Sequence, residues 1–170
     1  MKQLIRKQPT LFASIWFQCL WVMAVVGQYQ LQMVLLLCVG LTYLFAFRNL
    51  WATSWIFSIG LFADMLFTSL GLFQFKEPGL PLWLMGLWLA FAWYLVQMRH
   101  LLRWAGWPAL VILGSTLGPF SYWAGVKFNA VVWPVDIKLT LIVLGTWWAV
   151  FLPLSGYLAN REESYDANAQ

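Results

Sequence analysis

The chain has little charge and few of the side chains that carry common enzyme chemistry. Charged residues make up 9% of its 170 residues, with 6 acidic residues and a single histidine. Bis-histidine haem ligation and an H-E-x-x-H zinc site each need a second histidine, and an aspartyl dyad needs a second carboxyl in the same place. No phosphate-binding glycine loop and no serine paired with His100 is recognisable. We therefore expect no metal and no cofactor, and enzyme activity is disfavoured.

Cysteine is also scarce, and both cysteines lie in apolar stretches. The two residues are Cys19 and Cys38. Disulfides form in oxidising aqueous compartments, whereas a buried thiol behaves as a small apolar side chain. We expect two thiols and no disulfide.

Apolar residues are abundant and occur in long runs. They make up 62% of the chain, and the mean hydropathy is +0.74. A helix needs about 20 apolar residues to cross roughly 30 Å of hydrocarbon. We identify six such segments, which run from Thr10 to Gly27, Leu31 to Phe47, Trp51 to Phe73, Pro81 to Met98, Ala105 to Val126 and Lys138 to Leu158.

These segments predict an all-α fold, a polytopic bundle of six transmembrane helices in a single domain over residues 1–160. Strands could satisfy their backbone in lipid only within a closed barrel, and period-2 alternation is absent. The first segment follows basic residues, as a signal peptide would, but it has full spanning length and no evident cleavage site. We interpret it as a retained helix, and we expect the polar tail 161–170 to be disordered.

Positive charges are distributed unequally between the two sides of the predicted bundle. Seven basic residues fall on the side of the termini and three on the other side, which favours cytoplasmic N and C termini. The net charge of +4 is then a consequence of topology, and neither a basic stripe nor a motif indicates nucleic-acid binding. The seven are Lys2, Arg6, Lys7, Arg48, Arg99, Arg103 and Arg161; the three are Lys76, Lys127 and Lys138.

Short connections predict that neighbouring helices pack antiparallel. We expect tight turns at Gln28–Gln30 and at Arg48–Asn49. The stretch from Lys127 to Asp136 is long enough for a re-entrant or interfacial loop.

Asp64 is the only acidic residue deep inside a predicted span. An aspartate at the centre of a membrane helix costs about 2.5–3.5 kcal/mol even on the gentler scales, so it should face other helices. Gly60, Asp64, Thr68 and Gly71 share one face of this helix. This stripe is either the wall of a cavity in which Asp64 binds a ligand or carries a proton, or a packing seam with a hydrogen-bonded carboxyl.

The fifth segment has a second small-residue face, made of Gly114, Gly118, Ser121 and Gly125. Such spacing lets two helices approach closely. Pro119 lacks the N–H that would bond to the Ser115 carbonyl and should kink the helix, because proline breaks the helical ladder. The freed carbonyl forms either a polar pocket with Ser115, Thr116 and Tyr122 or part of a packing seam.

Other polar side chains complete the set of candidates. Gln18, with Ser14 one turn earlier, gives the first helix a polar face, which indicates an interhelical hydrogen bond or a ligand contact. We expect Asp64 to bond to Tyr122, Ser121 or Gln18. Arg99 and Arg103, at the cytoplasmic end of the fourth segment, could clamp a phosphate or lipid headgroup, although topology alone would also place arginines there.

Several motifs resemble an uncharacterised family of small proteobacterial inner-membrane proteins, which is catalogued as a domain of unknown function. They are Asp64 followed by Gly71, PLWLMGLWLAFAWYL at Pro81 to Leu95, RHLLRW at Arg99 to Trp104, and GSTLGPFSYWAG at Gly114 to Gly125. The resemblance implies a multi-pass protein of the bacterial inner membrane. Relatives encoded near lipid-modifying or oxidative-stress genes imply a lipid-related role. It also favours Asp64, Gly118, Pro119 and Tyr122 as site residues.

Three functions remain open at this point. The first is a lipid- or small-molecule-handling protein, transporter-like or accessory to a transporter, whose ligand binds between helices near Asp64 and Pro119. The second is a scaffold whose small-residue seams bind a partner membrane subunit or a second copy. The third is a lipid-modifying enzyme that uses Asp64, His100 and the two arginines.

Overall fold

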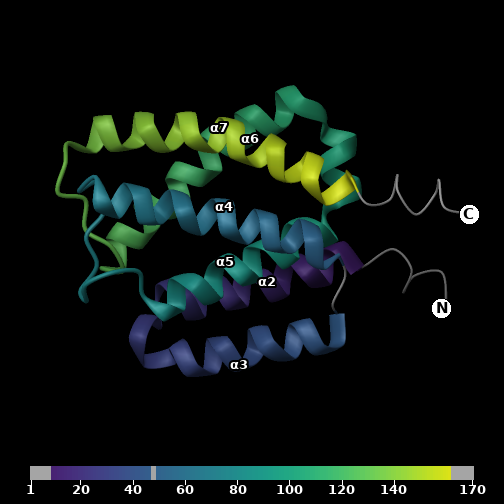
Figure 1. Cartoon of the computed structure of the whole chain (residues 1–170), viewed down its shortest axis with the longest axis horizontal. Helices are drawn as coiled ribbons and strands as arrows, with labels where there is room; N and C mark the ends of the chain where they lie inside the picture. Colours follow the sequence, from purple (N-terminus) through teal and green to yellow (C-terminus); the bar gives the residue numbers. More distant parts are fainter. Residues whose placement is uncertain (1–8, 47–48, 162–170) are drawn as a thin grey trace, which may run out of the picture.

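A computed structural model describes residues 9–46 and 49–161, which form six helices (Figure 1). The helices are α2 (Pro9–Val25), α3 (Gln28–Ala46), α4 (Leu50–Ser69), α5 (Leu82–Gln97), α6 (Arg99–Lys127) and α7 (Ile137–Arg161). Within these ranges no strand is present, and the one β-bridge joins Gln74 to Val132. The predicted helical fold is therefore confirmed. The tail beyond Arg161 and the basic residues Lys2, Arg6, Lys7 and Arg48 lie outside the described residues.

The helices run side by side between two ends of the bundle (Figure 1). α2 begins and α7 ends at one end, while the connections after α2, α4 and α6 lie at the opposite end. α5 is central, because it packs against α2, α3, α4 and α7, whereas α6 packs mainly against α7. The structure therefore divides into a core around α5 and an α6–α7 hairpin.

The outer faces of the bundle are apolar, as expected for helices in lipid. Phe12, Leu44, Phe45 and Ile142 are among its exposed large side chains. Among the described residues α3, α4, α6 and α7 are long and apolar enough to cross a membrane, and α2 and α5 are shorter apolar helices of 17 and 16 residues. These features identify a membrane protein.

Several helix ends differ from the boundaries that the sequence predicts, and two of these differences change a predicted turn or stripe. The turn expected at Gln28–Gln30 lies at Val26–Gly27, and Gln28 already begins α3. The side chain of Gln28 is buried, and its Nε2 donates to the backbone carbonyls of Val25 and Phe128. α4 ends at Ser69, so Gly71 does not belong to the helical stripe. Gly71 adopts φ 76° and, with Leu72, completes a Schellman cap, in which a glycine favours the left-handed conformation.

The fifth predicted segment belongs to a longer helix, which has a break that the sequence does not predict. Within α6 the one residue with non-helical backbone angles is Gly106, at φ 74° and ψ 166°. Residues 99–104, which lie between the fourth and fifth predicted segments, are helical, and Pro108 lies in the first turn after the break, where proline is tolerated. Pro119 lies in the helical part of α6. Glycine breaks this helix because it can adopt a positive φ at little steric cost.

The loop after α6 packs onto the loop between α4 and α5. Gln74 and Val132 exchange two backbone hydrogen bonds of 2.9 Å, and Ala130 and Val131 are buried. These two loops therefore close the end of the bundle opposite the chain termini.

Candidate functional site

Three helices converge on the carboxyl group of Asp64. The side chain lies on α4 and is fully buried. The Trp88 indole N–H of α5 donates to Oδ2 at 2.7 Å, and the Tyr122 hydroxyl of α6 donates to Oδ1 at 2.6 Å. The expectations that Asp64 faces other helices and bonds to Tyr122 are confirmed. One side chain thus joins α4, the central helix and the α6–α7 hairpin.

Close backbone packing keeps Trp88 at this position. Gly60 lies one turn before Asp64, and a Cβ atom there would overlap the Trp88 ring. On its other side Trp88 stacks on Trp148 of α7, with ring centroids 6.0 Å apart and planes at 11°. Tyr122 is supported in the same way, because it stacks on Phe73 at 5.1 Å. Packing therefore orients both donors toward the carboxyl group.

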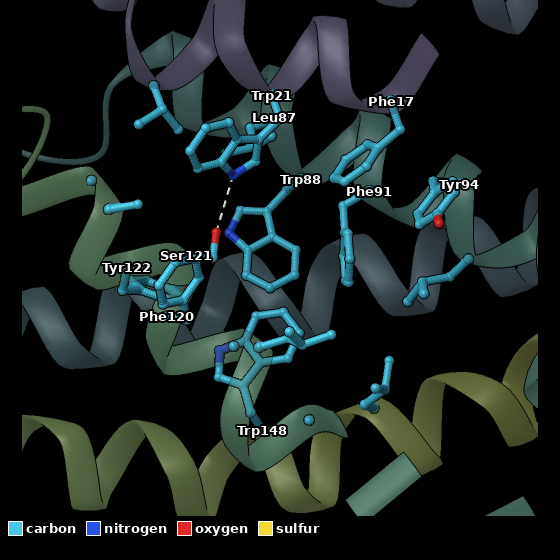
Figure 2. A pocket seen from close by; sticks show the side chains of 18 of the residues that line it. Phe17, Trp21, Leu87, Trp88, Phe91, Tyr94, Phe120, Ser121, Tyr122 and Trp148 are labelled. Carbon is cyan, nitrogen blue, oxygen red and sulfur yellow. Dashed lines mark hydrogen bonds between the residues drawn. The ribbon is translucent and has the colours of Figure 1, made fainter. Parts of the chain in front are cut away.

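A cavity of about 580 Å³ lies between α2, α5 and α6, with part of its wall supplied by α7. Its lining is mostly apolar and aromatic, and Figure 2 shows Trp88 near its centre, between Trp21 and Trp148. The volume falls within the range of small-molecule pockets, which are typically apolar with a few polar groups. Its aromatic lining includes Phe17, Trp21, Phe91, Tyr94, Phe120, Tyr122 and Trp148.

Side chains of α2 and α6 leave the cavity open toward the outside of the bundle. Gln18, Leu113, Leu117 and Phe120 line it and are also exposed. The Trp21 indole N–H bridges the two helices by donating to the Ser121 hydroxyl at 3.0 Å, drawn as a dashed line in Figure 2. The opening therefore faces the region that lipid chains would occupy.

Unsatisfied polar atoms occur around the cavity. The indole N–H group of Trp83 is buried and has no hydrogen-bond partner in the described part of the chain. The Gln18 amide also lines the cavity, and a membrane-embedded amide needs a hydrogen-bond partner. Such groups favour a ligand or lipid headgroup with polar atoms over a purely hydrocarbon molecule, because an unmet buried hydrogen bond costs about 1–3 kcal/mol.

The structure separates the predicted site residues into two groups. Gln18, Ser121 and Tyr122 line the cavity. Asp64 lies behind Trp88 and Tyr122 and does not line it, and the Thr68 hydroxyl donates to the Asp64 backbone carbonyl at 2.7 Å. Asp64 therefore orients two side chains that face the cavity.

Ser115 and Pro119 lie away from the cavity. The Ser115 carbonyl, left without its helical partner by Pro119, lies beside Gly145 of α7. The hydroxyls of Ser115 and Thr116 bond to the carbonyl of Ile112 on their own helix. The whole small-residue face of α6, Gly114, Gly118, Ser121 and Gly125, lines the cavity, and Gly114 and Gly118 also pack against Trp148.

The two candidate headgroup arginines are also separated. Arg103 Nη2 lies 3.1 Å from His100 Nδ1, and Arg103 lines a second pocket of about 550 Å³ between α6 and α7. Arg99 does not line that pocket; its Nη1 donates to the Val96 carbonyl at 3.4 Å.

Sequence reasoning missed the tryptophans that form the cavity. Trp21, Trp88 and Trp148 belong to a set of 13 tryptophans, so their type alone does not single them out. A usable signal was the spacing of small residues, because Gly60 and Gly118 each leave space for one of these rings.

In the described part of the chain, no three His, Cys, Asp or Glu side chains lie close enough to hold a metal ion. No curated protein and no solved structure matches the chain. A family model described as "Protein of unknown function (DUF2878)" matches residues 10–154. The match covers most of the chain and agrees with the resemblance to an uncharacterised family, so the chain belongs to this DUF2878 family.

Proposed function

We propose that this protein is a multi-pass protein of the bacterial inner membrane that binds a lipid or another small apolar molecule within the bilayer, as a transporter or an accessory to one. The observation that carries the proposal is the cavity of about 580 Å³ between α2, α5 and α6. It combines an apolar aromatic lining, few polar groups and an opening between two membrane helices. A ligand could enter it from the surrounding lipid without crossing water.

The proposal includes six crossings with both termini in the cytoplasm. α5 has only 16 residues, about 24 Å at 1.5 Å per residue, but it is surrounded by other helices and need not match the thickness of the lipid. Arg99, Arg103 and Arg161 belong to the end of the bundle where α2 begins. Lys76, Lys127 and Lys138 belong to the other end. Excess positive charge is typical of the cytoplasmic side, and in the sequence this excess comes from Lys2, Arg6, Lys7 and Arg48.

Cysteine labelling tests this topology. In a variant that lacks Cys19 and Cys38, a cysteine that replaces Glu77 in the α4–α5 loop should react with a membrane-impermeant maleimide in intact cells. A cysteine that replaces His100 should react only after permeabilisation, because it lies at the cytoplasmic end. Labelling in the reverse order, or of both cysteines in intact cells, would contradict the proposed topology.

Filling the cavity tests the binding function. A Cβ atom at Gly125 would make only an ordinary contact with Val131, so Gly125→Phe adds volume at the cavity wall with little initial overlap. Gly40→Phe is the matched control, because Gly40 is exposed on α3 with no atom within 4 Å of an added Cβ. We expect a co-purified ligand to be detected by native mass spectrometry in the wild type and in Gly40→Phe, and at least tenfold less of it in Gly125→Phe.

Two results of this experiment count against the proposal. One is a wild-type spectrum with no bound molecule beyond exchangeable detergent and annular lipid. The other is equal occupancy in both phenylalanine variants.

A further inference from the structure

The second pocket lies next to the cavity and has a different chemical character. It is formed by α6 and α7 at the end of the bundle where α7 ends, and its volume is about 550 Å³. The non-helical backbone at Gly106 lies in its wall. Arg103, Arg161 and Asn160 supply polar groups, and none of the described residues that line it is acidic.

The two spaces share part of their walls. Leu102 and Leu110 line both the apolar cavity and the basic pocket. From Leu110 to Gly125 the cavity follows α6 for roughly 22 Å, at about 1.5 Å per residue. This length is most of the hydrocarbon thickness of roughly 30 Å. An elongated chain therefore fits the cavity better than a compact molecule.

Asn160 adds a polar group whose oxygen has no partner among the described residues. Its Nδ2 donates to the carbonyls of Gly156 and Arg99, at 2.7 and 3.1 Å, which fixes the orientation of the amide. Its Oδ1 is buried and has no hydrogen-bond partner in the described part of the chain. An acceptor beside two guanidinium groups matches a headgroup that carries both an anionic group and a hydroxyl.

We propose that the ligand is an anionic, chain-bearing amphiphile whose phosphate binds Arg103 and Arg161 and whose chain lies in the cavity between α2, α5 and α6. This inference rests on the proposed function and specifies its ligand class. Guanidinium groups bind phosphate through charge-assisted hydrogen bonds, and Arg161 is held over the Trp51 ring at 5.4 Å. The headgroup would thus lie at the end of the bundle that we place in the cytoplasm.

The test uses the full chain in phosphatidylcholine nanodiscs and two probes that carry the same brominated acyl chain. One probe is a lysophosphatidate and the other an uncharged monoacylglycerol. Bromine in the cavity should quench the fluorescence of tryptophans such as Trp21, Trp88 and Trp148. We expect the lysophosphatidate to bind roughly tenfold or more tightly than the monoacylglycerol, because only its phosphate can accept charge-assisted hydrogen bonds from the arginines.

Variants identify the part of the site that each probe uses. Arg161→Gln and Arg103→Gln should each remove most of the preference for phosphate and leave binding of the monoacylglycerol unchanged. Lys127→Gln, which removes a positive charge at the other end of α6, should leave both affinities unchanged. Gly125→Phe should weaken the binding of both probes, whereas Gly40→Phe should not.

Four outcomes would overturn the inference. If the wild type binds both probes with equal affinity, the headgroup site is contradicted but the proposed function is not. If neither probe gives saturable quenching, both the headgroup site and the proposed function are contradicted. A third outcome is that inorganic phosphate binds, that Arg161→Gln abolishes this binding and Gly125→Phe does not change it, and that phosphate does not displace the lysophosphatidate. This outcome would indicate a site for free phosphate. The double variant Glu162→Gln, Glu163→Gln should keep the preference for the lysophosphatidate. If it loses this preference as Arg161→Gln does, the effect of Arg161→Gln comes from its acidic neighbours in the sequence and not from direct binding of phosphate by the arginine.

Discussion

Replacing Asp64 with leucine is expected to cost about 2–6 kcal/mol of folding free energy. The carboxyl group accepts hydrogen bonds from Trp88 and Tyr122, and both donors would keep their buried positions without an acceptor. Each unsatisfied buried donor costs about 1–3 kcal/mol. The loss should be visible as a lower midpoint in unfolding by sodium dodecyl sulfate, followed by tryptophan fluorescence.

Asp64→Asn is the matched variant. Its Oδ1 can accept from the Trp88 indole, and its Nδ2 can donate to the Tyr122 oxygen, because a tyrosine hydroxyl both donates and accepts. We expect this variant to lie within roughly 1 kcal/mol of the wild type. Equal losses in the leucine and asparagine variants would show that the two hydrogen bonds are not the reason for the aspartate.

Replacing Gly114 with alanine is expected to destabilise the α6–α7 hairpin by about 1–3 kcal/mol, the usual cost of overpacking. A Cβ atom at this position would overlap the backbone carbonyl of Trp148, which no change of side-chain rotamer can relieve. The two helices must therefore separate, which also shifts Trp148 at the cavity wall. The same detergent unfolding assay measures this effect.

Gly40→Ala is its control. The added methyl group meets no atom within 4 Å, and alanine favours a helix over glycine by up to about 1 kcal/mol. We therefore expect unchanged or slightly higher stability. If Gly114→Ala behaves in the same way, α6 and α7 do not pack as closely as the structure shows.

The helices could be predicted from the sequence because lipid imposes a simple rule on length and polarity. Each of the six apolar segments contains a helix, and the buried position of Asp64 follows from the cost of exposing a carboxyl group to lipid. Helix ends were less accurate, because they depend on local backbone conformations. Gly71 and Gly106 adopt positive φ angles at such positions. The sequence does not distinguish them from the glycines that lie inside helices.

The cavity could not be predicted, because it depends on how helices that are distant in the sequence lie against one another. Asp64 was expected to face a cavity or a packing seam, and it lies behind the two aromatic residues that form the cavity wall. Gln18 has no pattern that distinguishes a cavity-lining amide from one bonded to a neighbouring helix. Arg103 and Arg161 are 58 positions apart, and the α6–α7 hairpin brings them to one pocket.

Photo-crosslinking with a diazirine-labelled acyl chain tests the central claim, a ligand chain inside the bundle, most directly. The label is activated in nanodiscs that contain the full chain, and its adducts are mapped by peptide mass spectrometry. We predict adducts on Trp88 and Trp148, which line the cavity and are only 4% and 7% exposed. Adducts confined to outward-facing residues such as Phe45, which is 86% exposed, would contradict the claim.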